Sequence, residues 1–303
     1  MIALPEGWED ASCAVCGEGA GHVFLRARDL NWHVDEVLFR LVRCPSCGLT
    51  YVSPRPTRDR IGRFYPPDYA PHQEVQGFEG RVLGRRSKRF QPVRAMEPGR
   101  YLDVGCGSGG ALLRMKVGGW DVAGFEVSEQ AARAGRAGGL DIRTGRELAD
   151  AAFEARSFDL VTLFCVLPHL HDPQAVLAEV ARILRPGGVL LMTMPNLRSL
   201  NFMLFRQRWY HLDPPRHLHF FLPGNLRELA ARAGFVPEGR RFRSGGGGFK
   251  NSLRLSRSDL PWARLFEDLL RLRPMRWLSR FFFRYGVDAA RLGDTVDWWW
   301  RRV

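Results

Sequence analysis

The chain lacks several features that mark whole classes of protein. Its 303 residues contain no apolar run of about 18 or more, so no membrane-spanning helix is expected. The first ten residues contain no basic stretch followed by an apolar one, so no secretory signal peptide is expected. Lysine is scarce, because only Lys88, Lys116 and Lys250 occur among 45 basic residues. Arginine therefore carries almost all of the positive charge.

The remaining composition is that of an ordinary globular protein with a strong basic excess. Hydrophobic residues make up 45% of the chain, and its length allows two domains. The net charge is +13, and residues 240–303 contain 15 basic and 6 acidic residues, a net of +9. Most of the excess charge therefore lies in the last fifth of the sequence. We expect a cytoplasmic protein, and the basic C-terminal region leaves peripheral contact with the inner membrane surface open.

Four of the six cysteines form two closely spaced pairs, Cys13-x-x-Cys16 and Cys44-x-x-Cys47. Such pairs bend the chain so that their thiolates converge, and two of them complete a tetrahedral zinc site. All four ligands come from protein, so the predicted zinc ion is structural. Disulfides or free thiols are the alternatives, but a reducing compartment favours zinc.

Composition and the positions of proline and glycine divide the chain into three parts. Residues 1–55 are predicted to form a zinc ribbon, in which 23–25 and 37–42 are short strands. Residues 56–98 form a linker that includes a basic helical stretch at 81–94, either a solvated helix or a phosphate-binding face. Residues 99–303 are predicted to form the catalytic domain.

The catalytic domain is organised around residues 101–110, Tyr-Leu-Asp-Val-Gly-Cys-Gly-Ser-Gly-Gly. A buried strand is followed by a glycine-rich turn and then by a helical pattern. Glycine lacks Cβ, so the backbone can turn sharply and lie against a nucleotide, and the first helical N–H groups face that ligand. A second strand at 120–125 ends in Glu126, about 20 residues from the turn, where a carboxylate can accept ribose hydroxyls.

Asp-Val-Gly-Cys-Gly-Ser-Gly at 103–109 and Gly-Phe-Glu at 124–126 resemble motifs I and II of the class I S-adenosylmethionine-dependent methyltransferases. The segments 157–161, 166–173 and 184–188 are similar to later motifs of the same superfamily, and Tyr65 and Tyr69 resemble a segment that precedes motif I. The resemblance implies S-adenosylmethionine as cofactor. The residues expected to bind it are Asp103, Gly105, Cys106, Gly107, Gly109, Glu126, Val127, Glu147 and Phe164.

Helical and strand patterns alternate regularly after the glycine turn. Helices are expected at 128–138, 173–184 and 225–233, and strands at 140–143, 157–164, 189–195, from 234 and at 293–300. This order predicts an α/β, Rossmann-like parallel sheet with helices on both faces. The resemblance implies the seven-stranded methyltransferase form of that sheet. A flexible break is expected at 245–248, and a helical insertion at about 250–292.

Residues 209–221, Trp-Tyr-His-Leu-Asp-Pro-Pro-Arg-His-Leu-His-Phe-Phe, are predicted to form the acceptor wall. Histidine is suited to accept a proton near neutral pH, so His217, His219 and His211 are candidate general bases. Arg216 is a candidate for holding a phosphate or carboxylate. The competing interpretation is that some of these histidines simply cap the helix that begins near Pro223.

The Pro-Arg-His-x-His-Phe segment is similar to that of zinc-ribbon methyltransferases found with sugar and cell-surface polysaccharide biosynthesis. This resemblance implies a sugar, nucleotide-sugar, glycan or lipid-linked intermediate as acceptor. Two alternatives stay open, an RNA methyltransferase that grips phosphates with its ribbon and arginines, and a non-catalytic scaffold at the membrane. The apolar and arginine-rich insertion at 250–292 is interpreted as a lid, a dimer face or a membrane-surface element.

Overall fold

The computed structural model describes residues 4–66, 69, 88–244 and 246–303, and side chains other than those of Lys88, Arg89, Gly246, Arg276 and Arg280. The first half of the basic stretch predicted at 81–94, residues 81–87, and the loop around His72 lie outside these residues. The described end of that stretch is a 3-10 helix, η3 (Lys88–Val93).

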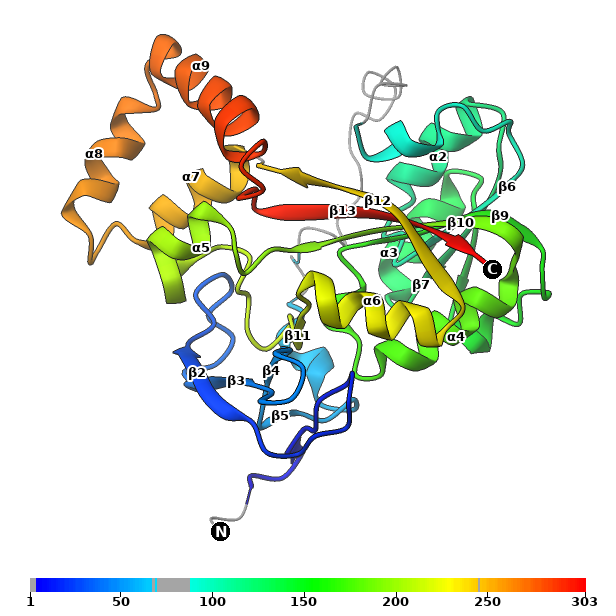
Figure 1. Ribbon diagram of the computed structural model, residues 1–303, viewed down its shortest axis with the longest axis horizontal. Helices are drawn as coiled ribbons and strands as arrows, with labels where there is room; N and C mark the ends of the chain where they lie inside the picture. The colour runs from blue at the N-terminus through cyan, green and yellow to red at the C-terminus, as the bar shows by residue number, and fades with distance from the viewer. Residues whose placement is uncertain (1–3, 67–68, 70–87, 245) are drawn as a thin grey trace.

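A seven-stranded sheet forms the centre of the molecule (Figure 1). Its strand order is β12-β13-β10-β9-β6-β7-β8, with β13 antiparallel to both neighbours and the pairs from β10 to β8 parallel. The strands are β6 (Arg100–Val104), β7 (Asp121–Glu126), β8 (Asp141–Thr144), β9 (Phe158–Phe164), β10 (Leu184–Pro195), β12 (Phe235–Arg243) and β13 (Thr295–Arg302). The predicted methyltransferase sheet is confirmed, and its carboxyl edge is where ligands of such sheets bind.

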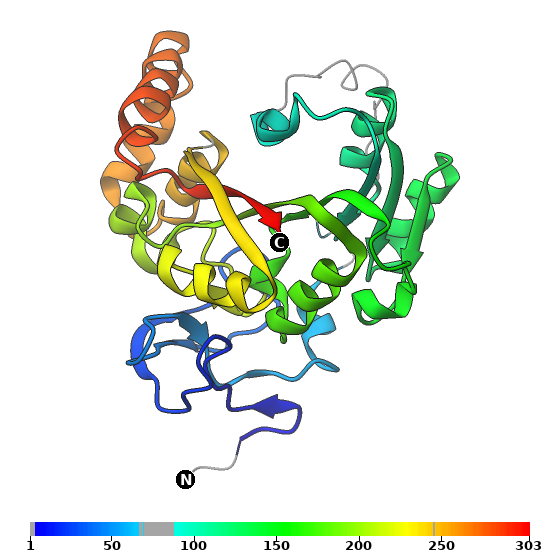
Figure 2. The ribbon, with the colours of Figure 1, turned by 45° about the vertical axis from the view of Figure 1, so that its right-hand side comes forward.

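Helices cover both faces of this sheet, as parallel strands require. On one side α2 and α3 pack on β6, β7 and β8, and on the other α4 and α6 lie between the sheet and the N-terminal region (Figures 1 and 2). The predicted helices are confirmed to within a few residues. They are α2 (Gly110–Val117), α3 (Glu129–Ala137), α4 (Pro173–Ile183) and α6 (Pro223–Arg232).

The start of α3 follows directly from its sequence. Ser128 is the N-cap, and its hydroxyl oxygen accepts a hydrogen bond from the Ala131 N–H at 3.3 Å. This bond satisfies one of the open donors of the first turn, as expected for serine at this position. The apolar side chains between this helix and the sheet are small alanines, so the helix packs close to β8.

The N-terminal region forms a second, four-stranded sheet of order β11-β4-β3-β2. Three strands come from the predicted ribbon, β2 (His22–Ala27), β3 (Phe39–Arg43) and β4 (Thr50–Val52), but β11 (His219–Phe220) comes from the catalytic domain. The backbone continues this link, because the Val52 N–H donates to the Leu218 carbonyl and the Leu218 N–H donates to the Pro168 carbonyl. The ribbon is therefore completed by the histidine segment. A short pair, β1 (Trp8–Glu9) with β5 (Arg55–Pro56), flanks it.

Between β12 and β13 lies the predicted helical insertion. Its helices are α7 (Gly246–Leu255), α8 (Pro261–Leu269), α9 (Arg273–Phe281) and the π-helix η7 (Phe282–Val287). The break expected at 245–248 is wrong, because α7 already includes residues 246–248. Space explains the glycine at 248: a Cβ there would lie 2.4 Å from Asp294 Oδ2. In both views α8 and α9 project from the body of the molecule (Figures 1 and 2).

Candidate active site

The glycine turn after β6 has the backbone that its sequence predicts. Gly105, Gly107 and Gly109 have φ values of 70°, 55° and 87°, in the left-handed region that favours glycine. The Gly105 and Cys106 N–H groups donate to the Phe125 carbonyl, which fixes the turn against β7. Gly109, the N-cap of α2, offers no side-chain cap, so the first-turn N–H groups of α2 have no side-chain acceptor from that position.

Two carboxylates converge on this turn. Glu126, at the tip of β7, accepts hydrogen bonds from the Gly107 N–H (2.8 Å) and the Ser128 N–H (2.9 Å). Asp103, at the end of β6, accepts from the Thr162 hydroxyl. Burial raises the pKa of the Cys106 thiol between them, and the charges of Asp103 and Glu126 raise it further. Cys106 is therefore a protonated packing residue, and the acids give the turn a negative potential.

These residues fit S-adenosylmethionine, which carries ribose hydroxyls, an amino group and a positively charged sulfonium. Glu126 can accept from the ribose hydroxyls, and the acids at 103 and 126 complement the positive charges. Val127 follows Glu126 and is 64% exposed, so its apolar side chain is free to contact adenine. Phe164, at the tip of β9, packs edge-on against Phe90 at 5.4 Å.

Glu147 does not fit its predicted role as well. It lies in the loop after β8, but its carboxylate forms an ion pair with Arg58. The acid that organises this loop is Asp150, whose Oδ2 accepts from the Arg146 and Glu147 N–H groups at 2.8 and 2.9 Å. The expected contact of Glu147 with the cofactor would require this ion pair to open.

A cluster of aromatic and histidine side chains lies beyond the cofactor turn. The Tyr65 hydroxyl and His169 Nδ1 are hydrogen-bonded at 3.0 Å, and the His169 and His217 rings are 4.5 Å apart. Burial raises the pKa of Tyr65, as do Asp213 and, last among the causes, Glu126. A Cβ on Gly105 would lie 2.5 Å from Val166 Cγ2, and Val166 precedes the 3-10 helix that ends at His169, so this cluster lies beside the cofactor turn.

His217 has a defined tautomer in this cluster. Its Nδ1 is 2.8 Å from the His211 carbonyl oxygen, an acceptor, so Nδ1 carries the proton and Nε2 is left as the basic nitrogen. Burial lowers the pKa of His217, while Asp213 acts in the opposite direction. The Asp213 carboxylate is itself paired with Arg216, whose charge lowers the pKa of His217 further. His217 is thus a neutral imidazole in which Nε2 can accept a proton.

Arg216 does not make the predicted contact with the acceptor, because it is buried. Its guanidinium is fully buried and forms ion pairs with Asp29 and Asp213, and it donates to the Phe64 carbonyl at 2.8 Å. All of its directions are occupied by protein, so no donor remains for a substrate phosphate. Arg216 instead joins the ribbon, the linker and the histidine segment.

His219 is also corrected by the structure. It lies in β11, is fully buried and packs against Phe221, with ring centroids 5.8 Å apart. Burial lowers its pKa to about 3, and the charges of Arg55 and His171 lower it further. Of the two candidate bases His217 and His219, His219 therefore belongs to the ribbon sheet and not to the histidine cluster beside the cofactor turn.

His211 belongs to a second buried group, with Asp294. A Cβ on Gly248 would lie 2.9 Å from His211 Nε2 and 2.4 Å from Asp294 Oδ2, so both side chains face the same point of α7. Asp294 accepts from Trp209 Nε1 at 3.0 Å. Burial lowers the pKa of His211 to about 4, and burial raises that of Asp294 to about 6.

Sequence reasoning did not select His169, Asp213 or Asp294 for this site. Asp213 follows His211 in the acceptor segment, and His169 lies in a segment already matched to a family motif. For these two residues, membership of a segment already selected was the signal that could have found them. Asp294 had no such signal, because only the pairing of β13 with β10 brings it to the carboxyl edge, beside Pro195.

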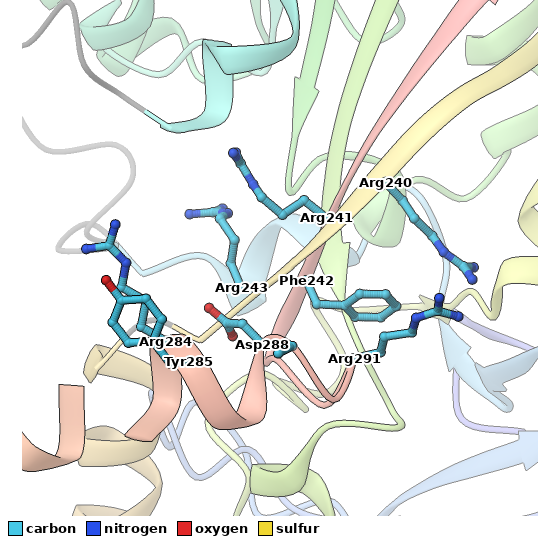
Figure 3. A pocket seen from close by; sticks show the side chains of 9 residues that line it. Arg240, Arg241, Phe242, Arg243, Arg284, Tyr285, Asp288 and Arg291 are labelled. Atoms are coloured by element: carbon cyan, nitrogen blue, oxygen red, sulfur yellow. The ribbon is translucent and has the colours of Figure 1, made fainter. Parts of the chain in front are cut away.

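Arginines line a cavity of about 430 Å³ between β12 and η7 (Figure 3). Arg243 lies at the same edge of the sheet as the end of β10, since it pairs with Thr295, which pairs with Pro195. Arg241 and Arg243 share the Asp297 carboxylate, at 3.2 and 2.6 Å. The lining residues are Arg240, Arg241, Phe242, Arg243, Arg284, Tyr285, Asp288, Ala289 and Arg291.

On the opposite face of β12, four arginines gather without an acid. Arg240 and Arg291 point to the same side in Figure 3, and with Arg198 they line a smaller cavity of about 150 Å³ over Trp298. Burial lowers the pKa of Arg240, and Arg227, Arg291 and Arg198 lower it further. Among the described residues, none of these four forms an ion pair. We call them the arginine quartet.

The four N-terminal cysteines converge as predicted. The Sγ atoms of Cys13, Cys16, Cys44 and Cys47 all lie within 4.8 Å of one another, and the pairs Cys13–Cys47 and Cys16–Cys44 are 3.4 Å apart. A tetrahedral zinc ion with Zn–S bonds of about 2.3 Å requires Sγ separations of about 3.8 Å, so the cluster fits this ion. The two cysteine loops share the same backbone hydrogen bond. The Gly17 N–H donates to the Cys13 carbonyl in one loop, and the Gly48 N–H donates to the Cys44 carbonyl in the other.

Comparison with known proteins agrees with this geometry. A family model described as a methyltransferase domain matches residues 76–238. The chain is 32% identical over 154 residues to the ubiquinone biosynthesis O-methyltransferase of Bordetella avium, covering 47% of this chain and 64% of that one. It is 40% identical over 123 residues to the enzyme of the same name from Hahella chejuensis, covering 38% and 51%. The chain thus spans less than two thirds of the length of these relatives.

Among solved structures, an S-adenosylmethionine-dependent methyltransferase from Mesorhizobium loti aligns with a TM-score of 0.49 at 18% identity, over 75% of this chain and 100% of that one. The family match covers more than half of the chain, and the strand order and glycine turn agree with it. The chain therefore belongs to the methyltransferase-domain family.

Proposed function

We propose that this methyltransferase modifies a hydroxyl group of a small phosphorylated acceptor, such as a nucleotide-sugar or a lipid-linked sugar. The observation that carries the proposal is the arginine-lined cavity beside the carboxyl edge of the sheet, with the arginine quartet behind it. Guanidinium groups without acidic partners suit phosphate oxygens, which they bind in a bidentate manner. The named relatives are O-methyltransferases, which supports a hydroxyl as the methylated group.

In this proposal each protein group has a limited task. S-adenosylmethionine, when bound, supplies an activated methyl group on a sulfonium. Asp103, Glu126 and the glycine turn position that cofactor. His217 accepts the acceptor's hydroxyl proton at Nε2, while its Nδ1–H stays bonded to the His211 carbonyl. Tyr65 and His169 orient His217 and exclude water, so that the enzyme acts mainly through positioning and proton transfer.

Methyl transfer from labelled S-adenosylmethionine to a panel of acceptors tests this proposal. The panel contains a nucleotide-sugar, the same sugar without phosphate, a polyprenyl-diphosphate sugar, a catechol and a short RNA. Transfer to a phosphorylated sugar is expected. The double substitution Arg240→Gln/Arg291→Gln should raise its KM about tenfold or more, because each charge-assisted hydrogen bond contributes about 1.5–3 kcal/mol. Arg254→Gln, on exposed α7, is the matched control.

Two outcomes would contradict the phosphate assignment. One is transfer to the catechol alone, with a KM that Arg240→Gln/Arg291→Gln leaves unchanged. The other is transfer to RNA with steep salt dependence, which would favour the nucleic-acid alternative.

We also propose that the cysteine cluster holds one structural zinc ion. Convergence of four thiols in two matched loops supports it, and the small ribbon core would gain stability from the metal. Elemental analysis of the purified chain should give one zinc per molecule. Cys47→Ser should lower that content, whereas Cys165→Ser should not. A metal-free native protein of unchanged stability would contradict this proposal.

A further inference from the structure

The exposed apolar side chains of this protein are concentrated on one projecting element. We call residues 261–287, which contain α8, α9 and η7, the arm. Of the 17 exposed large apolar residues in the described chain, nine lie on it. They are Trp262, Leu265, Phe266, Leu272, Trp277, Leu278, Phe281, Phe282 and Tyr285. Such a concentration on one surface marks a site of interaction.

The arm is held to the body by a different set of side chains. Ala263, Phe283 and Val287 are buried. Phe283 packs on Phe249 of α7 at 4.9 Å, and Phe249 packs on Phe205 at 5.6 Å. Trp262, although partly exposed, also packs on Phe205 at 5.7 Å. The inner face therefore already has its partners.

The outer face of α9 and η7 has a regular aromatic row. Trp277, Phe281 and Tyr285 follow at intervals of four residues, and their rings are in contact, with centroids 5.8 and 4.7 Å apart. Aromatic side chains, Trp and Tyr above all, are enriched where apolar and aqueous phases meet. Residues 261–291 contain seven arginines and three acids, a net of +4.

The acids on the arm are already paired. Glu267 forms an ion pair with Arg257 at 3.3 Å, and Asp268 forms one with Arg271 at 3.6 Å. Arg264 on α8 and Arg273 on α9 are exposed and form no ion pair among the described residues, so the arm carries free positive charge. Among the described residues, no helix is long and apolar enough to cross a membrane. The nine residues of α9 extend about 14 Å, roughly half of a hydrocarbon core.

We infer that the arm docks this enzyme on the surface of an anionic lipid bilayer, with its aromatic row in the interface and its arginines at the phosphates. Charge complementarity selects this partner, because a second copy of the same net-positive arm would bring like charges together. The inference deepens the proposed function, on which it rests for its consequence: the arginine cavity includes Arg284 and Tyr285 at the base of the arm, so a lipid-linked acceptor would reach the sheet edge from the bilayer.

Cosedimentation of the full chain with vesicles tests the docking. Vesicles of phosphatidylcholine with one quarter phosphatidylglycerol should bind the protein, and phosphatidylcholine alone should bind it at least tenfold more weakly. Trp277→Glu/Phe281→Glu should reduce binding more than tenfold, whereas Val23→Glu/Val236→Glu, exposed apolar positions elsewhere, should change it less than twofold. Arg264→Gln/Arg273→Gln should reduce binding to the anionic vesicles about 25-fold, at about fivefold per charge.

Three results would overturn the inference. Equal binding by the Trp277→Glu/Phe281→Glu and control variants would exclude the arm as the docking element. Absence of binding to anionic vesicles would exclude the bilayer. A concentration-dependent dimer that the same variant dissociates would assign the face to a second copy. S-adenosylmethionine affinity, measured on each preparation, separates these failures from a failure of the proposed function.

Discussion

The cofactor edge and the acceptor side of this enzyme are assembled in opposite ways. Residues 101–126 contain the whole glycine turn and both acids, and neighbouring strands bring them together. The acceptor side draws on the ribbon, the linker, the loop after β9 and the histidine segment, which meet only in three dimensions. A local motif fixes the first, and long-range packing fixes the second. Substitutions of the buried residues that join these segments should therefore affect the stability of the fold.

The largest expected effect separates chemistry from packing within the histidine segment. His217→Ala should lower kcat by about 10²–10⁴ with the acceptor found in the panel, because it removes the proton acceptor. His219→Ala should instead lower the free energy of unfolding and leave kcat of the folded fraction within a few fold. Calorimetry should give unchanged S-adenosylmethionine affinity for both variants. Equal kcat losses would return His219 to the catalytic group.

Arg216→Ala tests whether the acceptor side is a structural joint. The substitution leaves the Asp29 and Asp213 carboxylates in place without their cation, and breaking such a buried pair costs about 3–5 kcal/mol. Denaturant titration measures this loss. The exposed control Arg254→Ala should stay within about 0.5 kcal/mol. A stable Arg216→Ala protein that had lost only activity would restore the acceptor-binding role.

Asp294 should make the free energy of unfolding depend on pH. Burial raises its pKa from 3.8 to about 6, so its protonated form is favoured in the folded state. The stability it contributes is present below about pH 4 and is lost as pH rises through about 6. The difference amounts to about 3 kcal/mol, at 1.36 kcal/mol per pH unit. Buried histidines whose pKa is lowered, such as His211 and His219, change stability in the opposite direction over this range, so the informative quantity is the difference between the native protein and Asp294→Asn. Denaturant titrations between pH 4 and 7 should show the native protein losing about 3 kcal/mol relative to that variant as pH rises. Parallel profiles would contradict it.

The smallest effect is expected at the cofactor edge. Glu126→Gln removes the charge and leaves one acceptor oxygen for the Gly107 and Ser128 N–H groups, and should weaken S-adenosylmethionine binding about 10- to 100-fold. Glu129→Gln, on the exposed side of α3, should leave affinity unchanged. Calorimetry measures both. An unaltered affinity of Glu126→Gln would remove this acid from the cofactor site.

The same contrast explains what sequence reasoning could predict. Strand and helix order, the glycine turn, Glu126 and the four cysteines each depend on patterns among residues close in sequence. The structure has the expected strand order, brings Glu126 to the glycine turn and brings the four thiols together. Arg216 and His219 were predicted to face a substrate because residue type alone does not reveal burial. Arg216 meets Asp29, 187 residues away, and His219 pairs with Tyr51. No local pattern encodes either contact.

The pairing of β11 with β4 has a consequence for synthesis on the ribosome. The ribbon sheet acquires its edge strand only after residues 219 and 220 have emerged, although the cysteines appear within the first 47. During that interval β4 presents an open edge, and domains normally fold as units in the order of their emergence. A metal captured early would keep the nascent N-terminus compact until its missing strand arrives.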